Sequence, residues 1–169
     1  MKITQPVRQK HSCSQVWTGT RAEIFPLLCP VKEKMWAPDW DPKLVISNSG
    51  VIEQECLFIE ADTPVDAIWV VTEHNPVSFK VAMYRIVPGV IVGRFEICLD
   101  SEDTKTTNAY VSYEQTALSE AGEKIVNQFT TESFTEFMNE FTLAINHYLS
   151  MGTMIEGNRL MTQEEEIHH

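Results

Sequence analysis

Six consecutive strand-like segments joined by very short links constrain the fold of this chain more than any other feature. They lie at 43–48, 51–60, 66–74, 77–87, 90–100 and 106–117. Turn-forming pairs such as Asn75-Pro76 and Pro88-Gly89 separate them. Links this short join antiparallel neighbours, because a parallel connection needs a crossover of about a dozen residues or more. The middle of the chain therefore predicts an antiparallel sheet.

A further strand is predicted at 4–17, where side chains of two kinds alternate. One side carries Val7, Gln9, His11, Cys13, Gln15 and Trp17. This period of two is typical of a half-buried strand. Its inner face is unusually polar for a strand that packs on a core.

A long amphipathic helix is predicted between Ser119 and about residue 151. Apolar side chains recur there at three- and four-residue spacing: Phe134, Phe137, Met138, Phe141, Ala144, Ile145, Tyr148 and Leu149. Ser119 favours a first start, Ser133-x-x-Glu136 a second segment, and Gly152 the helix end. The apolar stripe spans about five turns, which is long enough to cross a whole sheet.

The connector from Pro26 to Trp40 is unusually apolar for a link between strands. Thr20-x-x-Glu23 predicts a short helix before it, and Pro30 suits the start of a second one that ends near residue 35. An apolar connector must cover something, so we expect it to lie over the open end of the sheet. Two interpretations stay open for Trp36, Trp40 and Cys29: they fill that end as core, or they line the mouth of a cavity.

The inward face of the hairpin formed by 77–87 and 90–100 depends on its turn. If the turn has two residues, Tyr84 lies opposite Gly93 and shares a face with Phe95. A bulge would reverse this pairing. Arg94 and Glu96 are interpreted as solvated strand residues, with a polar anchor inside a cavity as the alternative.

Composition limits the partners. The chain has 169 residues, 43% of them hydrophobic, and a net charge of −11. The acidic balance disfavours nucleic acid and anionic membranes, and no apolar run is long enough to insert into a membrane. The four cysteines are widely spaced, and the N-terminus has no secretory signal pattern, so a cytoplasmic location is expected. We expect one domain over 1–152 and an acidic, flexible tail over 153–169, and a homodimer is left open.

The order of elements, with strands followed by one long helix, predicts an α+β layer structure. It resembles the START-like or SRPBCC superfamily, also called the helix-grip fold. The stretch FPLLCPVKEKMWAPDW at 25–40, Ser49-Gly50 and TALSEAG at 116–122 are similar to a bacterial subgroup of that superfamily. The resemblance implies a curved seven-stranded antiparallel sheet wrapped around the C-terminal helix, with two short helices between the first two strands.

The resemblance also implies a cavity between sheet and helix. We expect it to bind a hydrophobic or amphipathic small molecule, lipid- or polyketide-like, through His11, Cys29, Trp36, Trp40, Phe95, Tyr113, Phe137, Met138 and Phe141. The alternatives are a cyclase- or aromatase-like enzyme in the same cavity and a chaperone-type interaction module. His11 is the candidate base of the enzyme, against the plainer interpretation of a core histidine bonded to a backbone carbonyl. No catalytic motif is found, and no cofactor or metal is expected.

Overall fold

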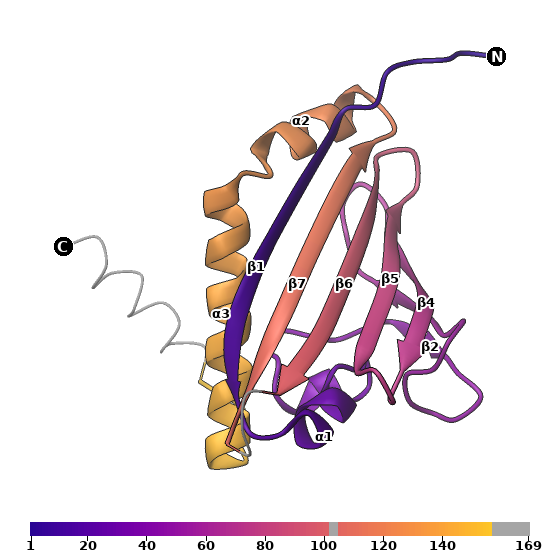
Figure 1. Ribbon diagram of the computed structural model, residues 1–169. Helices are drawn as coiled ribbons and strands as arrows, with labels where there is room; N and C mark the ends of the chain where they lie inside the picture. Colours follow the sequence, from indigo (N-terminus) through magenta and orange to yellow (C-terminus); the bar gives the residue numbers. More distant parts are fainter. Residues whose placement is uncertain (102–104, 157–169) are drawn as a thin grey trace.

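The computed structural model describes residues 1–101 and 105–156, and it has the predicted α+β architecture. Within these residues, seven antiparallel strands form one sheet in the order β1-β7-β6-β5-β4-β3-β2. The strands are β1 (Arg8–Thr18), β2 (Leu44–Ile46), β3 (Leu57–Glu60), β4 (Ala67–Asn75), β5 (Lys80–Val87), β6 (Ile91–Ser101) and β7 (Thr106–Ala117). The first strand of the chain, β1, pairs along its whole length with the last, β7, and β1 and β2 are the two edges of the sheet (Figure 1).

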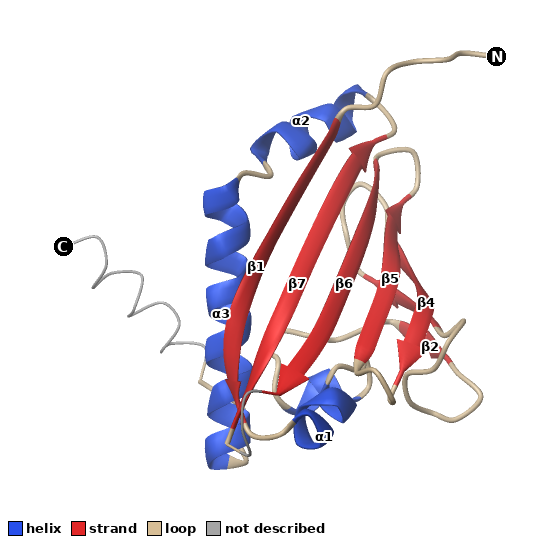
Figure 2. Ribbon diagram, viewed as in Figure 1, coloured by secondary structure: helices blue, strands red, loops and turns tan. Residues whose placement is uncertain are grey.

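Short helices fill the link between β1 and β2, as predicted. They are α1 (Arg21–Ile24), η1 (Phe25–Leu27) and η2 (Lys32–Met35). The Thr20 hydroxyl accepts a hydrogen bond from the Glu23 amide at 3.2 Å, which satisfies a free amide at the start of α1. In Figure 2 these short helices lie at one end of the sheet.

Two helices follow the sheet, α2 (Glu120–Gln128) and α3 (Thr131–Met151). The predicted helix start at Ser119 is confirmed, because Ser119 is the N-cap of α2. The second start, predicted at Ser133, lies three residues too late. Thr130 is the N-cap of α3, and Ser133 is the third residue of its capping box. Gly152 ends α3 in the left-handed conformation, with φ of 72°. Helix α3 then runs along the sheet beside β1 (Figure 1).

Two expectations about the strands are wrong. The segment 51–60 is a strand only from Leu57 onward. Before that, the Glu53 carboxylate accepts from backbone amides of the preceding loop, and Glu55 has φ of 67°, so extended pairing cannot form.

The turn of the β5–β6 hairpin contains three residues rather than two. Val87 pairs with Ile91, so Met83 lies opposite Phe95 and Tyr84 opposite Arg94. The extra turn residue puts Met83, in place of the predicted Tyr84, on the face of Phe95. Arg94 lies on the opposite, outer face, as expected for a solvated strand residue, and donates a hydrogen bond to the Tyr84 hydroxyl at 3.1 Å.

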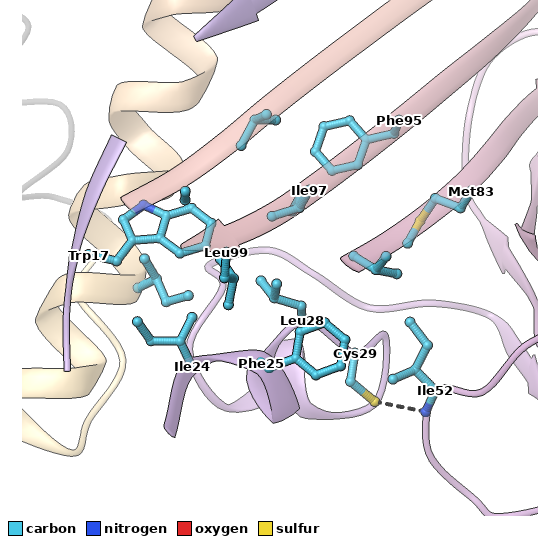
Figure 3. Close-up of a cluster of buried hydrophobic side chains, with 14 of the residues drawn as sticks. Trp17, Ile24, Phe25, Leu28, Cys29, Ile52, Met83, Phe95, Ile97 and Leu99 are labelled. Atoms are coloured by element: carbon cyan, nitrogen blue, oxygen red, sulfur yellow. Dashed lines mark hydrogen bonds between the residues drawn. The ribbon is translucent and has the colours of Figure 1, made fainter. Parts of the chain in front are cut away.

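The core lies between the inner sheet face, α3 and the short helices. Figure 3 shows side chains of β1, β5 and β6, such as Trp17, Met83 and Leu99, pointing toward side chains of the connector. Ile155 is 9% exposed and joins this core just after α3, so the described chain packs slightly beyond residue 152. The rest of the predicted tail, 157–169, lies outside the described residues. None of the described helices is both long and apolar enough to span a membrane.

Gly122 allows α2 to rest directly on the β5–β6 turn. A Cβ atom at this position would lie 1.9 Å from the Val90 carbonyl oxygen, which accepts a hydrogen bond from the Leu118 amide. We expect Gly122→Ala to lower the free energy of unfolding by about 2 kcal/mol in chemical denaturation, because helix or turn must shift. Asn127→Ala, at an exposed position of the same helix, is the control and should change it by less than about 0.5 kcal/mol. A stabilised Gly122→Ala variant would contradict the close approach.

Candidate functional site

A cavity of about 550 Å³ lies between the inner sheet face, the connector and α3. Strands β3 to β7 form its floor, and the connector residues from Leu28 to Trp40 form its lid. Phe137, Glu140, Phe141 and Ala144 of α3 complete the wall. The lining is mostly apolar, and the volume falls within the range of about 300–1,000 Å³ typical of small-molecule pockets.

The two lid tryptophans are held by the backbone of their own connector. The Trp36 indole nitrogen donates to the Leu27 carbonyl at 3.0 Å, and that of Trp40 donates to the Pro30 carbonyl at 2.7 Å. The Trp36 ring meets the Phe141 ring edge to face at a centroid distance of 5.0 Å. Because both polar NH groups are satisfied, the rings present apolar surface. The lid residues fill the sheet end and line the cavity at once.

Aromatic rings also form a continuous series across the floor. Centroid distances between successive rings are 5.3 Å from Phe58 to Trp69, 6.5 Å from Trp69 to Phe95 and 5.5 Å from Phe95 to Tyr113. Most of these contacts are edge to face, the geometry that ring quadrupoles favour. The floor is therefore a fixed aromatic surface.

Gly93 makes room for the Tyr113 ring. A Cβ atom at residue 93 would lie 2.5 Å from that ring. The two residues come from neighbouring strands, and β6 pairs with β7 so that Phe95 lies opposite Tyr113. A tyrosine does cover the strand glycine, but it comes from β7 and is not Tyr84.

Arg85 is a partly buried charge at one end of the floor. Its guanidinium pairs with the carboxylates of Glu60, at 3.5 Å, and Asp62. The Glu60 carboxylate also accepts a hydrogen bond from the Trp69 indole at 2.7 Å. Two carboxylates therefore compensate one guanidinium, which makes its burial tolerable.

Tyr113 and Gln115 lie beside Arg85 and face the cavity. Burial raises the pKa of the Tyr113 phenol, an effect that Arg85 and hydrogen bonding to Gln115 oppose, so the phenol is a neutral group. The Gln115 side-chain oxygen is buried and has no hydrogen-bond partner within the described part of the chain. A buried acceptor without a donor costs about 1–3 kcal/mol. The floor thus offers a site where a ligand donor would be stabilising.

Glu33 brings a carboxyl group to the lid. Although part of this residue is exposed, its carboxyl is surrounded by protein atoms, and this burial raises its pKa to about 8. The nearby negative charge of Glu60 adds to the shift. Glu33 is therefore protonated at neutral pH in the empty cavity. Water that enters the cavity lowers this raised pKa, because it solvates the carboxylate.

The structure brings most of the predicted site residues together. The cavity is lined by Cys29, Trp36, Trp40, Phe95, Tyr113, Phe137 and Phe141. The Cys29 sulfur also accepts a hydrogen bond from the Ile52 amide at 3.2 Å (Figure 3).

His11 and Met138 lie elsewhere, which corrects their predicted placement. The His11 ring lies 2.8 Å from the Phe129 carbonyl oxygen and packs against the Phe129 and Phe134 rings, so the junction of α2 and α3 covers it. This is the plainer interpretation, a core histidine bonded to a backbone carbonyl. Met138 is fully buried in the core.

Several residues that line the cavity were not predicted from the sequence: Glu33, Trp69, Met83, Arg85 and Gln115. Alternation along β5 puts Arg85 on the same face as Val81 and Met83. Which face points inward depends on the turn length, and the predicted turn was one residue too short. For Glu33, no local pattern distinguishes an enclosed carboxyl from a solvated one.

The fold is that of START-like, helix-grip structures. Norcoclaurine synthase from Thalictrum flavum, solved as a point mutant with a transition state analogue, superposes with a TM-score of 0.62 at 11% identity, over 87% of this chain and 97% of that one. A START superfamily protein from Mycobacterium smegmatis gives 0.61 at 9% identity, over 85% and 99%.

A third similar structure is BexL, the di-domain ARO/CYC protein of the BE-7585A biosynthetic pathway. It gives a TM-score of 0.60 at 10% identity, covering 85% of this chain and 47% of that one. At such identities the likeness concerns the fold alone. No protein-family profile and no curated protein sequence matches the chain, so the resemblance to a bacterial subgroup stays a prediction.

Proposed function

We propose that this protein binds a hydrophobic or amphipathic small molecule in the cavity between sheet and α3. The observation that carries the proposal is the cavity itself, about 550 Å³ in volume and lined mainly by aromatic and aliphatic side chains. Its few polar groups, among them Arg85, Tyr113 and Gln115, gather at one end. An apolar wall with a small number of placed polar groups is the usual composition of a ligand pocket.

The neighbours in fold support the same proposal from a second direction. The norcoclaurine synthase structures include one in complex with dopamine and hydroxybenzaldehyde, so that protein holds small aromatic molecules. A shared fold does not carry a function with it, so the proposal rests on the residues that line the cavity of this chain.

The alternatives receive unequal support. A chaperone-type interaction module is expected to have no void of ligand size, so a cavity of about 550 Å³ weighs against this alternative. An enzyme with His11 as its base is disfavoured, because His11 is not among the cavity lining residues and contacts the Phe129 carbonyl oxygen. Glu33, whose pKa is raised to about 8, favours an enzyme with a carboxylic acid as proton donor. Turnover that Glu33→Gln abolishes while ligand binding persists would establish this second candidate.

Filling the cavity should weaken binding. Ala144 is 3% exposed and lines the cavity from α3, so Ala144→Phe places a ring in the volume that a ligand would occupy. We expect this variant to bind the neutral apolar probe N-phenyl-1-naphthylamine at least about 10-fold more weakly, a loss of about 1.4 kcal/mol. Probe fluorescence measures the binding, and circular dichroism verifies the fold.

Ala121→Phe is the matched control, because it makes the same replacement at an exposed position of α2. Its probe affinity should equal that of the wild type. Native mass spectrometry of the purified chain adds a test without a chosen probe, in which a bound molecule appears as added mass. Absence of probe binding to the wild type, or equal binding by the Ala144→Phe variant, would refute the proposal.

A further inference from the structure

The cavity lining contains more acid than base. Glu33, Asp39 and Glu140 line it, whereas Arg85 is the single basic residue among the described residues of the lining. The Arg85 charge is already compensated, because Glu60 and Asp62 both pair with it. An anionic ligand would have to displace these carboxylates, and a cationic one would not.

Glu33 is the lining acid whose carboxyl a ligand could pair with. Among the described residues, its carboxyl makes no hydrogen bond and no ion pair. The carboxylate whose charge it senses, that of Glu60, is already bound by Arg85 and by the Trp69 indole. The charge now nearest to Glu33 in effect is the negative charge of Glu60, which disfavours the Glu33 carboxylate. A cation beside Glu33 would instead favour that carboxylate.

The tryptophans of the lining suit a cation as well. Trp40 and Trp69 line the cavity and are half-buried, and the fully buried Trp36 belongs to the same lining. Tryptophan is the best aromatic partner of a cation, and desolvation strengthens that attraction. The Arg85 guanidinium lies 5.8 Å from the centroid of the Trp69 ring, which shows that the floor already holds one positive group in this way.

Gln115 provides an independent indication. This residue lines the cavity and is 9% exposed, and its buried side-chain oxygen has no hydrogen-bond partner in residues 1–101 and 105–156. This acceptor needs a donor. An ammonium group offers only donors, whereas a carboxylate offers only acceptors and would leave the Gln115 oxygen unsatisfied.

We propose that the ligand of this cavity is an apolar, preferably aromatic, molecule that carries a protonated amine, and that the amine pairs with the Glu33 carboxylate. The inference rests on the proposed function, because it names the charged group of the molecule that the cavity would hold. The overall net charge of −11 also attracts such a ligand toward the protein.

Amine binding is coupled to a proton. Burial holds the proton on Glu33 up to about pH 8 in the empty cavity, and an ammonium ion beside it favours the carboxylate, so binding releases that proton. The other titratable or charged groups around the cavity are Cys29 and Asp39 of the connector, Glu60 of β3, Arg85 of β5, Tyr113 of β7 and Glu140 of α3. Affinity for the amine should therefore rise with pH through neutrality.

Three probes of matched shape test the inference: 2-(1-naphthyl)ethylamine, 2-(1-naphthyl)ethanol and 1-naphthaleneacetate. Isothermal titration calorimetry of the full chain near pH 7.5 gives their affinities. We expect the amine to bind at least about 10-fold more tightly than the alcohol, and the carboxylate to bind most weakly. Buffers of different ionisation enthalpy should reveal proton release with the amine and none with the alcohol.

Glu33→Gln removes the ionisable group while keeping its shape. The ratio of amine to alcohol affinity should fall at least about fivefold in this variant, and the proton release should disappear. Glu136→Gln, at an exposed position of α3, is the control and should keep the wild-type ratio.

The outcomes separate the inference from the proposed function. A carboxylate probe that binds as tightly as the amine, or an unchanged ratio in the Glu33→Gln variant, would overturn the inference alone. N-phenyl-1-naphthylamine would still bind in that case. Failure of this neutral probe and of all three naphthyl compounds would overturn both.

Discussion

Replacing Trp17 by alanine should lower the free energy of unfolding by about 3–5 kcal/mol, because the change empties a large site in the core. Trp17 of β1 is fully buried. Its indole nitrogen donates a hydrogen bond to the Thr142 hydroxyl of α3 at 3.0 Å, and its ring lies 5.5 Å from that of Phe141. Truncation removes all these contacts between the first strand and the last helix.

Denaturant unfolding followed by far-ultraviolet circular dichroism measures this loss without relying on tryptophan fluorescence. Trp17→Phe should cost less than half as much, because a ring still fills most of the site. Val16→Ala is the neighbouring control: Val16 is 53% exposed, and its truncation should change stability by at most about 0.5 kcal/mol. A loss below about 1 kcal/mol for Trp17→Ala would mean that this contact does not hold α3 on the sheet.

The same contact positions the cavity wall. Phe141 touches Trp17 on one side and Trp36 of the lid on the other, at centroid distances of 5.5 and 5.0 Å. Loosening of α3 would therefore move a lining residue and the lid together. We expect the Trp17→Ala variant to lose affinity for the apolar probe as well, although Trp17 does not line the cavity.

The architecture was predictable because its signals are local. Short links dictate antiparallel pairing, and the stripe that includes Phe134 and Ile145 identifies a helix that covers a sheet. The inward face of β5 was not predictable, because it depends on whether Val90 belongs to the turn. One residue there exchanges every side chain between the two faces.

The aromatic lid of the site was predictable, whereas its charged groups were not. An apolar connector between strands indicated a lid, and Trp36 and Trp40 do line the cavity. Arg85 is compensated by Glu60, at a distance of 25 positions along the chain, so no spacing rule connects them. His11 shares its side of the sheet with Tyr113, its cross-strand partner, yet Phe129 covers it. Such long-range packing is invisible to alternation.

The second large effect is a dependence of stability on pH that originates at Glu33. The pKa of this carboxyl is about 8 in the folded protein and near its ordinary 4.5 in the unfolded chain. Between these values the folded state keeps a proton that the unfolded state has released. Stability therefore falls as pH rises through this window, and the contribution is constant below about 4.5 and above about 8.

Glu33→Gln should abolish this slope, because glutamine resembles the protonated acid and has nothing to lose. Near pH 5 we expect variant and wild type to have similar free energies of unfolding. Near pH 8.5 the variant should be the more stable, by an amount on the order of 3 kcal/mol once water in the cavity is allowed for. Denaturant unfolding of the ligand-free protein across this pH range gives the difference in free energy of unfolding between variant and wild type. Other titrating groups, such as His74, are present in both proteins, so their contributions cancel in this difference. The exposed Glu136→Gln should follow the wild type at every pH, and a Glu33→Gln profile parallel to that of the wild type would mean that the Glu33 carboxyl is solvated like any surface acid.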